Sequence, residues 1–193
     1  MTTSILFKEL LRKGIHFLSL IIVLIYAYLG KQIILNLLSL YLAFILLIEH
    51  FRLSKGIKIP FFDFLFRDKE RACIGGHVFF VIGSLIAIGV YSKEVAITSI
   101  LLITFGDMAA SLVGITLGKT YIKDTNKSLE GSAAEFFTDL VIGSVILKNL
   151  PVAFVMAFVA TLTETFLSGI DDNLSIPVFA GLSAELMLLT IYL

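Results

Sequence analysis

Seven long apolar stretches, separated by short polar connections, take up most of this chain. An α-helix needs about 20 mostly apolar residues to cross the hydrocarbon core of a bilayer. Because 58% of the residues are hydrophobic and only 16% are charged, the sequence predicts an all-α, polytopic membrane helix bundle with about seven transmembrane helices. The predicted spans are 14–29, 32–48, 73–91, 95–117, 133–147, 151–169 and 174–193.

The connections and their charges predict the domain organisation and the orientation. The one sizeable polar segment runs from His50 to Arg71, so we expect residues 1–193 to form a single integral-membrane domain. Lysine and arginine accumulate on the cytoplasmic side of a membrane protein, and twelve of the 15 basic residues fall on the side that holds the N-terminus. This bias predicts a cytoplasmic N-terminus, in the cell membrane or, in a eukaryote, in the endoplasmic reticulum.

Composition also excludes several classes of function. Fifteen basic residues balance 15 acidic ones, so the chain lacks the basic surface that holds nucleic acid through its phosphates. A single cysteine cannot form an internal disulfide, and there are no Cys/His pairs at zinc spacing. We therefore expect neither a nucleic-acid-binding protein nor a zinc protein.

Several acidic residues lie inside the apolar stretches, where each charge costs at least ~2.5 kcal/mol and is by default functional. They include Asp107 and Glu164, together with Glu135 and Asp139, which are four residues apart and so share one helix face. We expect that face to look into the bundle and assign Glu135 and Asp139 to an intramembrane cavity for a lipid. Glu185, deeper in its stretch, is expected to have a structural role.

A stripe of small residues surrounds Asp107, at Gly106, Ala110, Gly114 and Gly118. Small residues at every fourth position permit close packing of two helices, which would place the carboxylate beside a neighbouring backbone. The segment 114–120 comes close to a Walker phosphate-binding loop, but it has three residues between its glycines instead of four, and it follows a helix. We therefore reject the Walker assignment. A glycine-bounded turn with Lys119 can nevertheless present backbone N–H groups and a positive charge to phosphate.

Three polar clusters open onto the predicted cytoplasmic side: residues 9–16 with Arg12, Lys13 and His16, residues 127–132, and the acidic pair Asp171 and Asp172. Each alone could be an anchoring cation group, a helix cap or a solvated turn. Together they supply carboxylates suited to Mg²⁺ and cations that neutralise a triphosphate, which is the equipment for phosphoryl or nucleotidyl transfer.

These residues resemble the polyprenol kinase family, which includes dolichol kinases, phytol kinases and CTP-dependent diacylglycerol kinases. The resemblance lies in four segments: E-x-x-R-K-x-x-H at 9–16, F-G-D at 105–107 with the small residues that follow it, K-S-x-E-G-S at 127–132, and Glu164 followed by D-D-N at 171–173 with Pro177. It implies transfer of the γ-phosphoryl group of CTP to the hydroxyl of a membrane lipid alcohol at the cytoplasmic face, with a divalent metal. The chain is far shorter than eukaryotic dolichol kinases, so dolichol, phytol, geranylgeraniol and diacylglycerol all stay open as substrates; we expect a polyprenol-type lipid.

The sequence thus assigns roles to individual residues. Asp107 would hold Mg²⁺ with Asp171 or Asp172, and the removal of the alcohol proton is left between His16 and Glu164, His16 because its reference pKa of about 6.5 lies near the operating pH. The residues expected to bind the nucleotide and its phosphates are Arg12, Lys13, Gly118, Lys119, Lys127, Ser128, Glu130 and Gly131. Two alternatives stay open: a CTP-dependent cytidylyltransferase acting on a phosphatidate-type lipid, and an ion-coupled transporter that uses the buried acids as a proton relay. The oligomeric state is left open.

Overall fold

The computed structural model describes residues 19–55, 73–123, 125, 127–167 and 169–192, and these ranges are almost entirely helical, with no strand. The helices are α2 (Ser19–Leu29), α3 (Lys31–Lys55), α4 (Gly76–Val90), α5 (Lys93–Leu101), the π-helical turn η2 (Leu102–Gly106), α6 (Asp107–Leu117), α7 (Leu129–Leu147), α8 (Leu150–Phe166) and α9 (Asp172–Tyr192). Because α5, η2 and α6 form one continuous helix, the described ranges contain seven continuous helices.

The all-α prediction is therefore confirmed, and each helix falls on one of the predicted apolar stretches. By length and composition, three helices of the described part are able to cross a membrane, namely Lys31–Lys55, Lys93–Leu117 and Asp172–Ile191. That all seven cross it, and that the N-terminus is cytoplasmic, stay predictions. The start of the first predicted span, at residue 14, lies outside the described residues.

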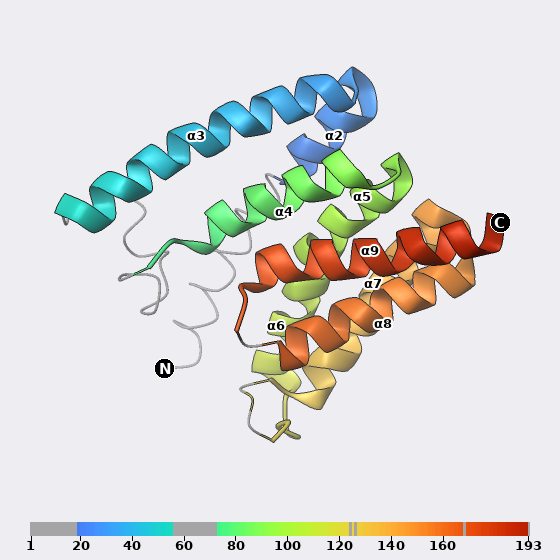
Figure 1. Ribbon diagram of the computed structural model, residues 1–193. Coiled ribbons are helices and arrows are strands. Elements are labelled where there is room, and N and C mark those ends of the chain that lie inside the picture. Colours follow the sequence, from blue (N-terminus) through green and yellow to red (C-terminus); the bar gives the residue numbers. More distant parts are fainter. Residues whose placement is uncertain (1–18, 56–72, 124, 126, 168, 193) are drawn as a thin grey trace.

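The helices pack as a bundle with α3 along one edge (Figure 1). Helix α3 packs on α4, α4 packs on α9, α9 packs on α8, and α8 packs on α7. Fully buried apolar side chains from α4, α5, α8 and α9 fill the space between them, among them Ile88, Ile100, Met156 and Ile176.

Short turns reverse the chain at the end of the bundle that holds the C-terminus. Gly30, between α2 and α3, has a φ of +89°, a left-handed conformation that glycine adopts without the steric cost of a Cβ. Lys148 and Asn149 connect α7 to α8, and the Asn149 side chain caps α8 by accepting a hydrogen bond from Val152 N at 3.3 Å. Because these turns are short, α2 packs against α3, and α7 packs against α8.

Polar side chains at this same end have structural partners. Lys31 Nζ donates to the carbonyl of Gly89 at 2.8 Å, at the C-terminus of α4, where helix carbonyls lack partners. The carboxylate of Glu185 accepts hydrogen bonds from Ser92 N at 3.0 Å and Ser92 Oγ at 2.9 Å, just before α5 begins. Glu185 thus has the structural role that we expected for it.

The other end of the bundle holds the α6–α7 and α8–α9 connections, the C-terminus of α3 and the N-terminus of α4. Of the cations in the described residues, Arg52, Lys55, Lys119, Lys123 and Lys127 lie there, and we call it the cation-rich end. It faces the left and bottom of Figure 1.

The start of α9 packs closely against Gly83 of α4, at a place where Pro177 leaves a backbone carbonyl of α9 without its usual helical donor. Pro177 has no N–H, so the carbonyl of Asn173, one turn earlier, has no helical donor there. Gly83 of α4 approaches this place so closely that a Cβ on it would lie 2.7 Å from Asn173 O and 2.8 Å from Pro177 Cγ. This contact fixes the position of the acidic residues at the start of α9.

Candidate active site

The α6–α7 connection folds back on itself at the cation-rich end. Residues Tyr121 and Ser128 form an isolated antiparallel bridge, and Leu129 N donates to Thr120 O at 2.8 Å. Ile122 N also donates to Lys127 O at 2.9 Å. The connection is therefore a narrow hairpin that brings Lys127 and Ser128 back beside the end of α6.

Glu130 fastens this hairpin to the first turn of α7. Its carboxylate accepts hydrogen bonds from Lys119 N at 3.2 Å and from Thr120 N at 3.1 Å. A hydrogen bond from its own backbone N–H, and then those from Lys119 and Thr120, lower the pKa of Glu130 against a smaller opposing effect of desolvation. The carboxylate thus stabilises the backbone of the segment that the sequence assigned to nucleotide binding.

Glycines allow α6 and α7 to approach closely above the hairpin. Ser128 is the N-cap of α7, and its Oγ accepts a hydrogen bond from Gly131 N at 3.1 Å. A Cβ on Gly131 would lie 2.8 Å from the carbonyl oxygen of Ala110 and 3.3 Å from the Cα of Gly114. A Cβ on Gly118 would likewise lie 2.9 Å from Ser128 Oγ. The predicted stripe of small residues therefore does permit close helix packing, and Gly131 belongs to the same contact.

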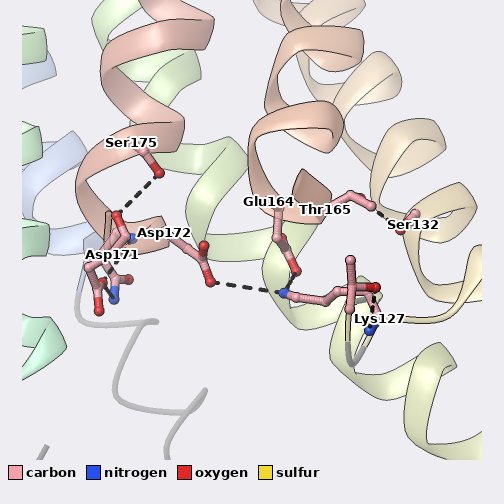
Figure 2. A network of polar contacts seen from close by, with 9 residues as sticks. Lys127, Ser132, Glu164, Thr165, Asp171, Asp172 and Ser175 are labelled. Carbon is pink, nitrogen blue, oxygen red and sulfur yellow. Dashed lines mark hydrogen bonds and ion pairs between the residues drawn. The ribbon is translucent and has the colours of Figure 1, made fainter. Parts of the chain in front are cut away.

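Lys127 reaches from the hairpin to two acids on other helices (Figure 2). Its ammonium group donates a hydrogen bond to Glu164 Oε1, at the end of α8, and lies 3.9 Å from Asp172 Oδ2, at the start of α9. Burial alone would lower the pKa of Lys127, but the carboxylates of Glu164 and Asp172 outweigh it, and its pKa is raised. Lys127 is therefore a cation that ties three segments of the chain together.

Beneath Lys127, buried carboxylates continue into the bundle. Glu135 and Asp139 are each 1% exposed, and Glu135 lies against Glu164. Asp107, at the start of α6, is also buried and interacts electrostatically with Lys127, Glu135 and Asp139. We call Asp107, Glu135, Asp139 and Glu164 the acid cluster.

Several oxygens of the acid cluster have no hydrogen-bond partner within the part of the chain that the structure describes. They are Glu135 Oε2, Glu164 Oε2 and both carboxylate oxygens of Asp139. Buried polar atoms are normally satisfied, and such exceptions call for a proton, an ion or a ligand. The cluster is thus a place where the chain itself leaves hydrogen-bonding capacity unused.

The two adjacent acids before and within α9 differ in their contacts. Asp171 Oδ1 accepts hydrogen bonds from Asn173 N at 3.2 Å and from Asn173 Nδ2 at 2.8 Å, and the Asp171 carbonyl accepts from Ser175 N at 3.0 Å. Asp172 instead points toward Lys127 (Figure 2). Of the two, Asp172 is the one placed to share a ligand with Lys127, and Asp171 caps the helix.

The structure brings most of the predicted residues to one place, although their roles stay predictions. Gly118, Ser128, Glu130 and Gly131 build the hairpin and its junction with α7, while Lys127, Asp172 and the acid cluster form the buried part. Lys119 contributes its backbone N–H to Glu130, and its side chain is exposed. Arg12, Lys13 and His16 lie outside the described residues.

Two polar links at this end were not anticipated from the sequence. Ser132 Oγ and Thr165 Oγ1 hydrogen-bond at 3.0 Å and join α7 to α8 beside Glu164. In α3, the buried Glu49 pairs with Arg52 at 2.5 Å, and His77 Nε2 of α4 lies 3.5 Å from Glu49 Oε1. The predicted span ended at residue 48, whereas α3 continues to Lys55, and the i,i+3 spacing of Glu49 and Arg52 was the signal available.

The residues present fit a magnesium ion that is shared with a ligand. Among the described residues, no group of three or more His, Cys, Asp or Glu side chains forms a protein-only metal cage. Mg²⁺ usually takes one or two protein carboxylates and completes its shell with water and substrate phosphates. Asp107 and Asp172 interact electrostatically with each other and with Lys127, and their carboxylates are of the kind that such a site uses.

Fold and site together define a class: an all-helical protein with helices long and apolar enough to cross a membrane, whose cation-rich end carries a lysine above buried acids. Within this class the chain is similar to three proteins named CTP-dependent diacylglycerol kinase 1. The one from Schizosaccharomyces pombe is 30% identical over 61% of this chain and 62% of its own length. The one from Eremothecium gossypii is 29% identical over 61% and 46%, and the one from Saccharomyces cerevisiae is 31% identical over 42% and 31%.

These homologues confirm the resemblance and support a CTP-dependent lipid kinase family for this chain. The chain spans less than two thirds of the length of the relatives that it matches. No family model matches the chain, and no solved structure matches it.

Proposed function

We propose that this protein is an integral-membrane kinase that transfers the γ-phosphoryl group of CTP to the hydroxyl of a lipid alcohol at the cytoplasmic face. The observation that carries the proposal is the position of Lys127, which lies between Glu164 and Asp172 and within electrostatic reach of Asp107. A cation at the mouth of a buried acid cluster can bind phosphate on one side, while the acids serve a metal and a proton. The similarity to proteins named CTP-dependent kinases supports the nucleotide.

Lys127 would bind the phosphates, and Asp107 and Asp172 would hold Mg²⁺. When bound, the ion would supply positive charge to the phosphates during phosphoryl transfer. The hairpin, fastened by Glu130, would bind the nucleotide through its backbone and through Lys119. Arg12 and Lys13 belong to this proposal as further phosphate-binding cations.

Glu164 is proposed as the group that takes the proton of the alcohol, with His16 as the second candidate. The alcohol oxygen forms a bond to the γ-phosphorus while the bond from that phosphorus to the β–γ bridging oxygen breaks. CDP leaves, and the alcohol proton passes to the Glu164 carboxylate. Glu164 is suited to this because its Oε2 has no hydrogen-bond partner among the described residues, while Oε1 binds Lys127.

The lipid is the less defined half of the proposal. The sequence prediction favours a polyprenol-type alcohol such as dolichol, phytol or geranylgeraniol, and the names of the relatives favour diacylglycerol, which the sequence had left open. Each of these lipids carries one hydroxyl on an apolar body, so the same site would serve any of them. We place diacylglycerol and the polyprenols in one panel and let transfer rates decide.

Labelled CTP tests the proposal. Purified protein in mixed micelles receives CTP labelled on the γ-phosphate, Mg²⁺ and each lipid alcohol in turn, with ATP as the comparison nucleotide. The kinase predicts labelled lipid and unlabelled CDP. Labelled pyrophosphate and unlabelled lipid, when phosphatidate replaces the alcohol, would instead support a cytidylyltransferase, and solute flux in liposomes without nucleotide turnover would support a transporter. Asp107→Asn serves as the matched inactive variant, because it removes the charge and keeps the shape.

A further inference from the structure

An apolar groove of about 540 Å³ lies on the outside of the bundle, between η2 and α7. It is lined by Phe105, Phe137, Thr138, Val141 and Ile142. The hydroxyl of Thr138 donates to the carbonyl of Ala134 at 2.7 Å, within its own helix, so it offers no free donor to the groove. The volume is in the range of small-molecule sites, about 300–1,000 Å³, and the wall accepts hydrocarbon.

The predicted span 133–147 places the groove within the hydrocarbon core of the bilayer. Val141 follows the start of that span by about 12 Å along the helix axis, at about 1.5 Å per residue. One leaflet contributes about half of a hydrocarbon core of about 30 Å, so on this prediction Val141 lies in the half of the leaflet nearer the bilayer centre. Phe137 and Val141 are 63% and 64% exposed, so the groove opens sideways from the bundle. At this depth, only hydrocarbon from the surrounding lipid can enter from that side.

The groove also lies directly beside the acid cluster. Phe105 lines it, and the next residue, Gly106, lies so close to Asp139 that a Cβ there would overlap the carboxylate. The π-helical turn produces this arrangement, because it carries an aromatic side chain to the groove and a bare backbone to the acid. π-Helical turns of this kind occur frequently at functional sites. One turn of helix thus separates an apolar surface from the deepest acid of the site.

We propose that this groove binds the hydrocarbon chain of the lipid alcohol and thereby sets the preference for chain length. The inference rests on the proposed kinase function and deepens it. A lipid whose hydroxyl lies at the level of Lys127 extends its chain toward the bilayer centre, along α7. A short chain ends before the level of Val141, whereas a long chain reaches the groove and gains contact with Phe105 and Phe137.

Filling the groove tests the inference by activity. Val141→Trp places a large side chain in it, and Leu186→Trp on α9 is the matched control, since Leu186 is 54% exposed and does not line the groove. We measure kcat/KM with dioctanoylglycerol and dioleoylglycerol, and with geraniol and geranylgeraniol. Val141→Trp should lower kcat/KM for the long-chain member of the active pair about tenfold and leave the short-chain member within about twofold. Equal losses for both lengths, or no loss, would overturn the inference.

Photocrosslinking tests it without turnover. The full chain in phosphatidylcholine vesicles receives a diacylglycerol, or a geranylgeraniol analogue, with a diazirine at the far end of its chain and no CTP. Labelling of residues 137–142 that excess unlabelled lipid alcohol suppresses, and that Val141→Trp abolishes, supports the groove. Labelling that excess phosphatidylcholine suppresses equally well would mean annular lipid and refute it. Groove labelling in a protein that shows no CTP-dependent transfer would refute the proposed function but support lipid binding in the groove. Transfer without groove labelling would support the proposed function and refute the groove.

Discussion

Replacing Lys127 separates its structural contribution from its proposed chemical one. The Glu164 side chain is 2% exposed, so Lys127→Met leaves a buried carboxylate without its cation. Breaking a fully buried ion pair costs about 3–5 kcal/mol, but the Lys127 side chain is 36% exposed and solvent screens part of the interaction. We therefore expect a loss of about 2 kcal/mol in the free energy of unfolding, measured by denaturant titration in mixed micelles.

The double variant Lys127→Met with Glu164→Gln is the decisive comparison. Removing the charge of Glu164 also removes the unpaired carboxylate, so we expect the double variant to recover at least half of the lost stability. Phosphoryl transfer from CTP should stay at least a hundredfold below wild type, about 2.7 kcal/mol in transition-state stabilisation, because neither the phosphate-binding cation nor the proton acceptor is restored. Lys123→Met, an exposed lysine of the same hairpin, should leave stability unchanged.

The reasoning on Lys127 fails under two results. Lys127→Met as stable as wild type would mean that the contact with Glu164 contributes nothing in solution. A double variant that recovers both stability and transfer would mean that the pair is only a structural tie and that another group binds the phosphates.

Three further predictions concern the neighbouring segments. Gly131→Ala should cost about 1–3 kcal/mol of unfolding free energy in thermal or denaturant melts, because its Cβ would lie 2.8 Å from the Ala110 carbonyl, whereas Gly89→Ala, with nothing within 4 Å, should not destabilise. Asp172→Asn should raise the Mg²⁺ concentration needed for half-maximal transfer, and Asp171→Asn, which alters a turn, should lower the melting temperature without that shift. The pKa of Glu130 is lowered in the folded protein, so its charged carboxylate should make the wild-type protein more stable than Glu130→Gln. This difference in stability should be complete above the ordinary pKa of 4.5 and disappear as the pH falls through the lower pKa of the folded protein. A difference in stability that does not change between pH 7 and pH 3 would contradict this.

The positions of the helices could be predicted because the bilayer imposes their length. Each apolar stretch must satisfy its backbone hydrogen bonds internally, so it forms a helix wherever it occurs. The ends were less predictable: the second predicted span stopped at residue 48, but pairing with Arg52 allows Glu49 to be buried and α3 to continue to Lys55. A charged residue therefore does not end a helix when a residue of opposite charge lies one turn away and pairs with it.

The shared face of Glu135 and Asp139 was also predictable, because four residues make about one helical turn. What lies opposite that face was not. The contact of Glu135 with Glu164 and that of Asp139 with Gly106 depend on how α7 packs against α8 and η2, and no spacing within one helix encodes this. The π-helical turn and the different contacts of Asp171 and Asp172 also depend on tertiary packing.

In the proposed site, the charges around Lys127 would connect nucleotide binding with metal binding. In this structure one ammonium group serves two carboxylates, those of Glu164 and Asp172. If Lys127 turns toward the phosphates of a nucleotide, both acids lose their cation while they stay near Asp107 in a poorly solvated site. Such a rearrangement is favourable only when new positive charge arrives in the same step, and a nucleotide that carries Mg²⁺ brings it. Mg²⁺ would therefore restore to the two acids the positive charge that they lose when Lys127 binds the nucleotide. By linkage, Mg²⁺ should raise the affinity of the site for nucleotide by the same factor as nucleotide raises its affinity for Mg²⁺.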